Sequence, residues 1–314
     1  MASTRTTVRV GDRELSVSNL DKVLYPGTGT TKAEVLRYYV DVAEVMLPHL
    51  AGRPVTLKRF PDGVEAEGFF EKRCPPHAPE WMGTVQLGRE GRDKPGKVGS
   101  GGKVVDHCDL SEVAALAWAA NMGALELHVP MGAAPDTTIP TAVVFDLDPG
   151  APADVRTCAE VALHIREVLD GLHLRSYPKT SGSKGLQLYV PVHDPDLTYD
   201  RTRNFSQAVA QLLETRLPDL VVSKQLKTLR PGKVLIDWYQ NHLTKTTVCA
   251  YSLRARPRPT ASTPLTWDEV DDAATEDEGA LVFDLDDVRA RVAEHGDLFA
   301  DVASLRQELP ALGG

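Results

Sequence analysis

The chain has 314 residues, of which 42% are hydrophobic and 25% charged, and these values are typical of a globular protein with a large core. A net charge of −9 argues against a protein that coats nucleic acid indiscriminately, although basic residues gather over 89–103 and 224–233. No apolar run approaches the roughly 18 residues of a membrane span, and the N-terminus lacks an apolar signal core, so we expect a cytoplasmic protein without membrane contact.

The first half of the chain predicts a hairpin, a long helix and several short strands. Residues 8–17 alternate in polarity around Gly11-Asp12, which indicates a hairpin turn. The sequence Thr31-Lys32-Ala33-Glu34 is a capping box, and the helix that it begins is expected to run to about Leu50. Further expected elements are strands over 54–60, 68–70 and 125–129, a mobile glycine-rich loop over 88–103, and a helix over 111–120 capped by Ser111.

In the second half, a buried strand over 141–147 runs into Asp148-Pro149-Gly150, and an amphipathic helix over 153–171 follows. The remaining expected elements are a Gly/Ser/Lys loop that leads into a strand over 185–192, a helix over 202–217, and strands over 234–238 and 247–253. Strands and helices alternate without a strict βαβ rhythm, so the predicted fold is mixed α/β with antiparallel sheets flanked by helices. We expect one domain over 1–314, with a lobe over 1–140, a core over 141–260 and a helical tail over 261–314.

The four cysteines are far apart and form no C-x-x-C pair, which predicts free thiols in a reducing cytoplasm; they are Cys74, Cys108, Cys158 and Cys249. An alternative is a zinc site made by Cys74 and His77 together with His107 and Cys108. Because this spacing is not that of a zinc site, a proline-rich loop and a strand end are the preferred interpretation.

Asp146 and Asp148 are separated by one residue in a buried strand, so their carboxylates project from the same face. Two neighbouring carboxylates are costly unless a cation neutralises them, and hard divalent ions prefer oxygen ligands. The alternative is a strand that simply leaves the sheet into an Asp-Pro-Gly turn. The same letters recur at Phe283–Asp286 before an amphipathic helix, where we interpret the aspartates as a helix cap.

Asp237 is an acid inside the apolar strand VLIDW, and such a position is costly unless the carboxylate is paired or bound to metal. It is the candidate third ligand of a two-metal site. The alternative is a salt bridge to a basic residue such as Arg254.

Other residues could contact phosphates or bases. In the loop over 181–185, the glycines allow backbone amides to approach phosphate oxygens, whereas the alternative is a plain glycine hairpin. His128 ends the LELHVP strand, where a lone histidine is more often structural than catalytic. The rings of Phe69 and Phe70 could belong to the core or, if exposed beside cations, could stack on bases.

Several motifs in order resemble the polymerase domain of bacterial ligase D, in the archaeo-eukaryotic primase superfamily; they include SNLDKVLYP, TTKAEV, RPVTLKRFPDGV, FFEK, LELHVP, VVFDLDPG, TSGSKG, LIDWYQN and YSLRARP. This resemblance implies a template-dependent nucleotidyltransferase that fills gaps and extends ends during non-homologous end joining. It implies two Mn²⁺ or Mg²⁺ ions and a preference for ribonucleotides over deoxyribonucleotides. The implied partners are nucleoside triphosphates, DNA gaps or ends with a 5′-phosphate, Ku and an ATP-dependent DNA ligase, in the cytoplasm at the nucleoid.

The resemblance also assigns roles to individual residues. The matched metal ligands are Asp146, Asp148 and Asp237, and the matched nucleotide contacts are Lys58, His128, Ser181, Lys184 and Arg254. The matched DNA contacts are Asn19, Lys22 and Lys32 for a downstream 5′-phosphate, Phe69 and Phe70 for template stacking, and Arg230 in a basic loop. Gln187 stands in the nucleotide site where the family has histidine. A neutral amide makes weaker hydrogen bonds to phosphate than a charged imidazole, so we expect weaker activity and a gain from Gln187→His.

Two rival functions remain at this point. A haloacid-dehalogenase-like phosphatase also places a DxD after an apolar strand, but it usually has Thr or Val where this chain has Pro149. The other rival is a non-catalytic scaffold that binds DNA ends through the phosphate pocket and has lost polymerase activity.

Overall fold

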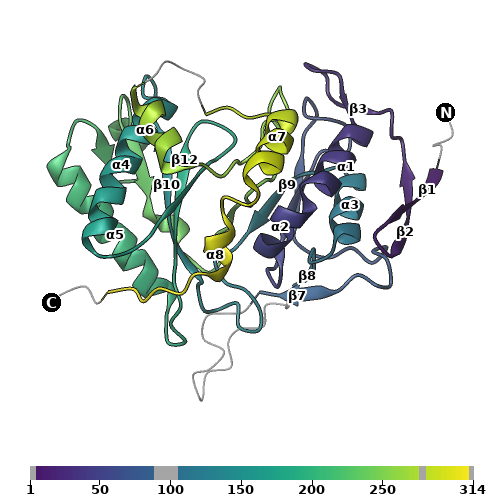
Figure 1. Ribbon diagram of the computed structural model, residues 1–314, viewed down its shortest axis with the longest axis horizontal. Coiled ribbons are helices and arrows are strands. Elements are labelled where there is room, and N and C mark those ends of the chain that lie inside the picture. Colours follow the sequence, from purple (N-terminus) through teal and green to yellow (C-terminus); the bar gives the residue numbers. More distant parts are fainter. Residues whose placement is uncertain (1–4, 88–104, 276–280, 311–314) are drawn as a thin grey trace. The chain divides into compact units, whose positions relative to one another are not determined.

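The structure is a computed structural model, and it describes residues 5–87, 105–275 and 281–310 (Figure 1). The chain forms two compact units, each made of segments that are distant in sequence. Unit 1 comprises 1–138, 246–261 and 284–296, and unit 2 comprises 139–245, 262–283 and 297–314. The basic loop expected over 88–103 lies outside the described residues. None of the helices within the described ranges is long and apolar enough to cross a membrane.

Unit 2 is built on a five-stranded sheet in the order β11-β12-β10-β14-β13. The strands are β11 (Tyr177–Thr180), β12 (Leu186–Pro191), β10 (Ala142–Pro149), β14 (Val234–Asp237) and β13 (Val221–Val222). All neighbours are antiparallel except β13 and β14. The predicted mixed α/β fold with antiparallel sheets and flanking helices is therefore confirmed.

Strand β10 divides its side chains between the two faces of this sheet. Val143, Phe145 and Leu147 are fully buried in a core shared with helices α4 (Val155–Gly171) and α5 (Tyr199–Arg216), which lie together on one side of β10 and β12 (Figure 1). The alternation of a strand then places Asp146 and Asp148 on the opposite face, away from these helices. The apolar half of the strand thus fixes the direction in which its carboxylates point.

A buried asparagine replaces a missing strand neighbour beside β10. Strand β14 pairs with β10 only from Asp146 onward, so the backbone of Val144 has no strand partner on that side. Asn241, with no exposed surface, accepts from Val144 N at 2.9 Å and donates to Val144 O at 2.7 Å. One side-chain amide therefore satisfies both backbone groups at the point where the strand approaches its carboxylates.

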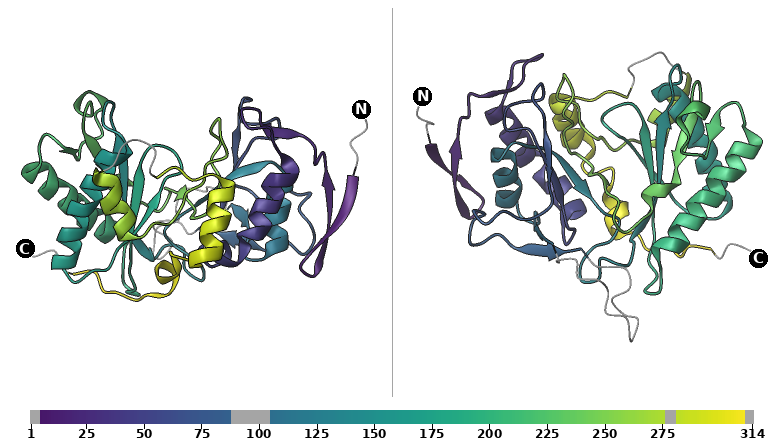
Figure 2. Two further views of the ribbon diagram at one scale, coloured as in Figure 1. Left: turned by 45° about the horizontal axis from the view of Figure 1, so that its top comes forward. Right: turned by 180° about the vertical axis from the view of Figure 1, so that it is seen from behind.

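Unit 1 contains a four-stranded antiparallel sheet in the order β15-β9-β5-β6. Its strands are β15 (Thr247–Val248), β9 (Ala124–Val129), β5 (Thr56–Arg59) and β6 (Phe69–Glu71). Shorter pairs are β1 (Arg5–Val10) with β2 (Arg13–Ser18), β3 (Val23–Tyr25) with β4 (Thr30–Thr31), and β7 (Thr84–Gln86) with β8 (Asp106–Cys108). The predicted hairpin around Gly11 is the β1–β2 pair, visible at the N-terminus in Figure 2.

The helix expected to run to Leu50 is two helices. The capping box at Thr31 is present and begins α1 (Lys32–Asp41), but Val42 leaves the helical conformation with ψ 3° before α2 (Ala43–Leu50). The next helix, α3 (Val113–Asn121), begins after an extended Glu112 that makes no side-chain cap, so the predicted Ser111 cap is wrong.

The C-terminal segments are shared between the units. Helix α7 (Leu285–His295) belongs to unit 1, whereas α6 (Trp267–Thr275) and α8 (Ala300–Ser304) belong to unit 2. Asp284 caps α7 through a capping box with Asp287, so the structural interpretation of the second FDLD sequence is confirmed. The expected division at residues 140 and 260 differs from these units because 246–261 and 284–296 return to unit 1.

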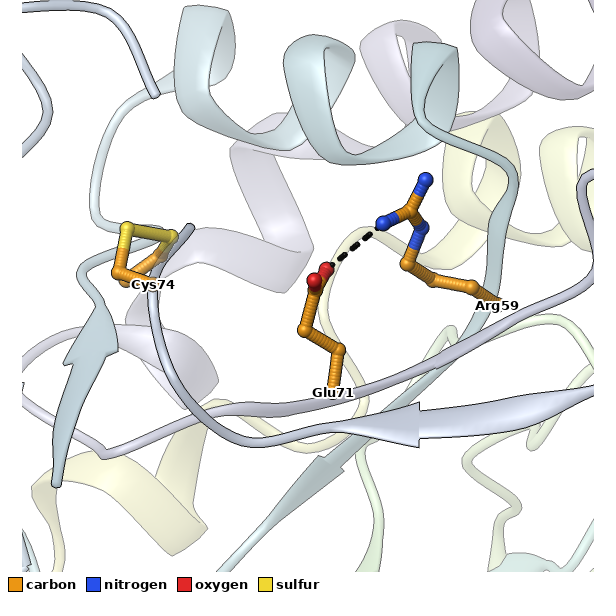
Figure 3. The surroundings of a disulfide bond; sticks show 4 residues. Arg59, Glu71 and Cys74 are labelled. Carbon is orange, nitrogen blue, oxygen red and sulfur yellow. Dashed lines mark hydrogen bonds and ion pairs between the residues drawn. A yellow bond between two sulfur atoms is a disulfide. The ribbon is translucent and has the colours of Figure 1, made fainter. Parts of the chain in front are cut away.

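The prediction of four free thiols is wrong for Cys74 and Cys108, which form a disulfide (Figure 3). The backbone explains their proximity, since Cys74 N donates to Asp106 O at 2.7 Å and so aligns the segment after β6 with β8. The disulfide also takes up both sulfurs that the alternative zinc site would need. Cys158 and Cys249 remain thiols outside any disulfide, as expected, and both are buried.

Candidate active site

Three carboxylates converge on the face of the unit 2 sheet that is turned away from α4 and α5. Asp146 lies directly opposite Asp237 in the β10–β14 pairing, and Asp148 follows two residues along the same face of β10. One oxygen from each of the three lies within 4.8 Å of the others. We call Asp146, Asp148 and Asp237 the carboxylate triad. The structure therefore brings together the three residues that the sequence suggested as metal ligands.

The triad is electrostatically strained without a cation. Burial raises the pKa of Asp146 to about 7, and the charges of Asp148 and Asp237 add to this, while a hydrogen bond from Gln187 and the charge of Lys179 oppose it. Burial and the charge of Asp237 also raise the pKa of Asp148. Three hard oxygen donors that repel one another match the requirements of a divalent cation, so the residues present fit such an ion.

Asp237 does not form the alternative salt bridge with Arg254. Its Oδ1 accepts from Gln225 Nε2 at 2.7 Å and from Tyr239 N at 3.0 Å, and its Oδ2 accepts from Gln240 Nε2 at 3.2 Å. These three donors are uncharged, so they orient the Asp237 carboxylate but do not neutralise its negative charge.

Arg230 lies beside the triad, at the end of a short 3₁₀ turn over Lys227–Leu229. Its guanidinium donates to the backbone oxygen of Gln225 at 2.8 Å, and its charge opposes the rise in the pKa of Asp148. Gly150 allows this approach, because a Cβ there would overlap the Arg230 carbonyl oxygen. The residue predicted to contact DNA is therefore close enough to the triad to influence its charge.

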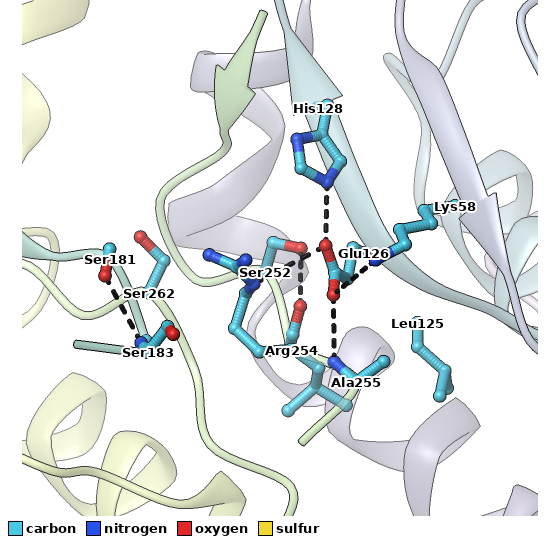
Figure 4. A network of polar contacts seen from close by, with 12 residues as sticks. Lys58, Leu125, Glu126, His128, Ser181, Ser183, Ser252, Arg254, Ala255 and Ser262 are labelled. Atoms are coloured by element: carbon cyan, nitrogen blue, oxygen red, sulfur yellow. Dashed lines mark hydrogen bonds and ion pairs between the residues drawn. The ribbon is translucent and has the colours of Figure 1, made fainter. Parts of the chain in front are cut away.

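The loop at 181–185 is held by its own side chains. Ser181 Oγ accepts from Gly185 N at 3.1 Å and from Ser183 N at 3.3 Å, as Figure 4 shows for Ser183. Gly182 has φ +65°, and a Cβ on Gly185 would overlap the Leu147 carbonyl oxygen. These amides thus stabilise the loop, in contrast to the sequence-based picture of amides directed at phosphate. Lys184 is exposed at its tip.

Gln187 is buried on β12 and contacts the triad directly. Its Nε2 donates to Asp146 Oδ1 at 2.9 Å, and its Oε1 accepts from Lys179 Nζ at 2.6 Å. Both ends of the amide are therefore engaged by residues of unit 2.

In unit 1, a buried glutamate that the sequence reasoning did not single out gathers three predicted nucleotide contacts (Figure 4). Glu126 is 2% exposed and lies in the middle of β9. Its carboxylate lies 2.8 Å from His128 Nε2, 3.6 Å from Lys58 Nζ and 3.5 Å from Arg254 Nε. We call these four residues the Glu126 cluster. An acid inside the apolar strand LELHVP is the same signal that identified Asp237, and it could have identified Glu126.

Opposite effects set the pKa of Glu126. Burial alone would raise it, but the hydrogen bond from His128, the charge of Arg254 and a hydrogen bond from Ala255 N lower it to about 2. Glu126 is therefore ionised at neutral pH and acts as the common anchor for the three basic side chains. The three basic side chains therefore share one carboxylate, and Lys58 and His128 also contact the Phe70 ring.

Phe69 and Phe70 are exposed on β6, at 46% and 59%, which excludes the core interpretation. The Arg59 guanidinium lies 5.2 Å from the Phe69 ring centre, and Lys58 Nζ lies 5.6 Å from that of Phe70. Exposed rings beside cations can accept a stacked base.

Asn19, Lys22 and Lys32 come together at the start of α1. Lys32 N donates to Lys22 O at 2.8 Å, Lys22 N donates to Asn19 O at 3.0 Å, and Asn19 has φ +55°. Burial and the nearby charge of Lys22 lower the pKa of Lys32 to about 8. Two cations that repel each other beside a helix N-terminus favour the binding of an anion.

Comparisons with known proteins agree with this geometry. A family model for the LigD primase-polymerase domain matches residues 31–299. The multifunctional non-homologous end joining protein LigD of Mycolicibacterium smegmatis is 44% identical over 286 residues, which are 90% of this chain and 35% of that protein. The bifunctional LigD of Bacillus subtilis is 31% identical over 297 residues, which are 95% of this chain and 45% of that protein. This chain therefore spans less than half the length of either relative.

The solved polymerase domain of Mycobacterium tuberculosis ligase D, in complex with DNA, matches with a TM-score of 0.82 and 39% identity over 93% of this chain and 98% of that chain. The mixed α/β fold, the carboxylate triad and these matches define an enzyme domain of the polymerase class of nucleotidyltransferases. The chain belongs to the LigD primase-polymerase domain family. Its polymerase class and its triad together indicate the use of a divalent metal ion.

Replacing Asp146 should stabilise the metal-free protein in a pH-dependent way. The folded-state pKa of about 7 exceeds the ordinary value of 3.8, so the stability that protonated Asp146 provides is complete below about pH 4 and is lost as the pH rises through 7. At pH 8 we expect the free energy of unfolding of Asp146→Asn to exceed that of wild type by at least about 2 kcal/mol. Near pH 4 the two free energies should be equal. Urea denaturation in EDTA measures this, and a difference that does not change with pH would contradict it.

Replacing Glu126 should have the opposite pH dependence. Its folded-state pKa of about 2 lies below the ordinary 4.5, so the stability that the carboxylate provides is present above pH 4.5 and is lost as the pH falls toward 2. We expect Glu126→Gln to lower the free energy of unfolding by about 2 kcal/mol at pH 7, and by less at pH 4. Glu112→Gln, which alters an exposed pair with Arg13, is the control and should change stability by less than about 0.5 kcal/mol. Equal losses in both variants would show that the Glu126 cluster is not a buried anchor.

Proposed function

We propose that this chain is a template-dependent polymerase module that fills gaps and extends DNA ends during non-homologous end joining. The observation that carries the proposal is the carboxylate triad, whose oxygens converge within 4.8 Å on one face of the sheet in a chain of the polymerase family. The named relatives are end-joining proteins, and the matched solved domain is a polymerase domain with DNA.

In this proposal, Asp146, Asp148 and Asp237 hold two divalent ions, Mn²⁺ or Mg²⁺. When bound, such ions lower the pKa of a primer 3′-hydroxyl and stabilise negative charge on the transferred phosphoryl group and on pyrophosphate. Asp237, which lies opposite Asp146 and is oriented by amide donors, chiefly serves the ion nearer the 3′-hydroxyl.

The proposed triphosphate contacts lie in both units. In unit 1 they are Lys58, His128 and Arg254, whose shared anchor Glu126 holds three cationic or donor groups at fixed positions. In unit 2 they are Ser181, Lys184 and Gln187, of which Lys184 presents an exposed charge. Preorganised cations of this kind stabilise a polyphosphate without rearrangement during the reaction. We propose ribonucleoside triphosphates as the preferred substrates, with deoxyribonucleotides as the alternative.

The proposed DNA contacts explain how an acidic protein can bind DNA. Asn19, Lys22 and Lys32 bind the downstream 5′-phosphate, whose charge relieves the repulsion that lowers the pKa of Lys32 to about 8. Phe69 and Phe70 stack against the template, and Arg230 contacts DNA near the triad. Recognition of one terminus requires few phosphate contacts, so a net charge of −9 is no obstacle.

The proposed partners of the activity are Ku, which brings DNA ends together, and an ATP-dependent DNA ligase that seals the product. The expected place of action is the nucleoid in the bacterial cytoplasm. Both follow from the proposed role in end joining and are tested by co-purification with DNA ends.

The two FDLD sequences provide a matched pair of variants for the activity. Asp148→Ala removes a triad ligand, so we expect at least about a 100-fold loss of primer extension on a gapped duplex with a 5′-phosphate, Mn²⁺ and ribonucleoside triphosphates. Asp286→Ala changes the corresponding residue of the second copy, which pairs with Arg289 on the surface of α7, and should extend primers as wild type does.

Each rival function predicts a different result in the same assay. If the wild-type protein binds the gapped duplex through its 5′-phosphate but extends no primer, the polymerase proposal is wrong and the non-catalytic scaffold is favoured. Release of phosphate through a covalent aspartyl-phosphate would favour the phosphatase.

Recognition of the 5′-phosphate is tested separately from the chemistry. Lys32→Met keeps the length of a buried side chain but removes its charge, so the preference for a 5′-phosphate over a 5′-hydroxyl should fall about tenfold. Fluorescence anisotropy with the two DNA ends measures the preference. Lys245→Met, in unit 2, is the control. An unchanged preference in Lys32→Met would place the phosphate elsewhere.

A further inference from the structure

One row of side chains crosses the sheet of unit 2 and ends at the triad. The strand pairings place Lys179 opposite Gln187, Gln187 opposite Asp146, and Asp146 opposite Asp237. Directly opposed residues share a face and lie close enough for their side chains to touch. The row therefore runs from a lysine, through a neutral amide, to two carboxylates.

Hydrogen bonds connect the first three members of this row. Lys179 Nζ donates to Gln187 Oε1 at 2.6 Å, and Gln187 Nε2 donates to Asp146 Oδ1 at 2.9 Å. Lysine offers only donors, so the oxygen of the amide must face it, and the amide nitrogen must then face Asp146. Lys179 thus decides which end of Gln187 meets the carboxylate.

Lys179 is itself held firmly. It has no exposed surface, and its Nζ also donates to Ser262 Oγ at 2.7 Å and lies 5.5 Å from the ring centre of Tyr189. Ser262 Oγ in turn donates to Thr180 O at 2.7 Å. A fully buried lysine is rare unless it is paired, and here its charge is directed toward the carboxylates.

We propose that Lys179 and Gln187 are positioning residues that act as one unit to orient Asp146 for metal binding. This inference rests on the proposed metal-dependent function. Lys179 supplies the positive charge, and Gln187 transmits it as a hydrogen bond whose direction is fixed. The Gln187 amide nitrogen donates its hydrogen bond to Asp146. In this proposal Gln187 therefore orients a metal ligand and does not contact a phosphate.

The same geometry bears on the substitution Gln187→His. A neutral imidazole has one acceptor nitrogen and one N–H donor, so it can accept from Lys179 and donate to Asp146 as the amide does. A protonated imidazole has no acceptor and would face the lysine with a second positive charge. Gln187 and a neutral histidine therefore offer the same two hydrogen bonds. Gln187→His should add no positive charge at this position, so we no longer expect it to raise activity by binding phosphate more strongly.

The test measures Mn²⁺ binding to the full chain without DNA or nucleotide, by electron paramagnetic resonance titration. Gln187→Met keeps the volume but removes both hydrogen bonds, and we expect Mn²⁺ affinity to fall about tenfold, as for other residues that orient metal ligands. Lys179→Met should cause a similar loss, and the double variant should lose no more than either single variant. Gln187→His should retain Mn²⁺ affinity within about threefold.

Gln211→Met, on the exposed face of α5, is the matched control and should bind Mn²⁺ as wild type does. Urea denaturation confirms that each variant is folded, and if Lys179→Met does not fold, Gln187→Met and Gln187→His decide the matter. Wild-type affinity in Gln187→Met, or losses that add in the double variant, would overturn the inference. So would a rise of more than threefold in primer extension by Gln187→His at unchanged Mn²⁺ affinity, because it would indicate direct contact with phosphate.

The outcome also separates this inference from the proposed function. If wild type binds Mn²⁺ and Gln187→Met binds it equally well, only the inference fails. If wild type itself binds no Mn²⁺, both fail.

Discussion

Repulsion among three carboxylates on one face of a sheet is the constraint that organises unit 2. The apolar residues of β10 pack against α4 and α5 and so force Asp146 and Asp148 onto the opposite face. The pairing with β14 then places Asp237 against them. Neutral amide donors orient the carboxylates, and Lys179 and Arg230 offset part of their charge, yet the pKa of Asp146 still rises to about 7. The site is thus prepared for cations at a cost to the stability of the metal-free protein.

Unit 1 shows the complementary arrangement, in which one buried acid organises several basic groups. Glu126 holds His128, Lys58 and Arg254 within 3.6 Å of its carboxylate. In unit 2 a lysine and an amide orient an acid, and in unit 1 an acid orients the bases. In both units a candidate site residue is oriented by a buried partner behind it, so the geometry of the proposed site depends partly on residues that are not themselves proposed ligands.

Local patterns predicted the features that local physics determines. The capping boxes at Thr31 and Asp284, the first hairpin and the shared face of Asp146 and Asp148 all depend on residues a few positions apart. Lys179 escaped because its role depends on neighbours across a sheet, and strand order cannot be read from polarity alone. Glu126 did carry a local signal, an acid inside an apolar strand, but the pattern does not show which basic residues surround it. The Cys74–Cys108 disulfide was missed for the same reason, since β8 brings together residues separated by 34 positions.

The return of 246–261 to unit 1 affects the order in which the protein can be completed during synthesis. All strands of the unit 2 sheet lie between 142 and 237, whereas the unit 1 sheet needs β15 at Thr247–Val248. The ribosome therefore delivers the entire carboxylate triad before it delivers Arg254, the last member of the Glu126 cluster. The sheet that begins first is therefore completed second, and no single cut in the chain separates one unit from the other.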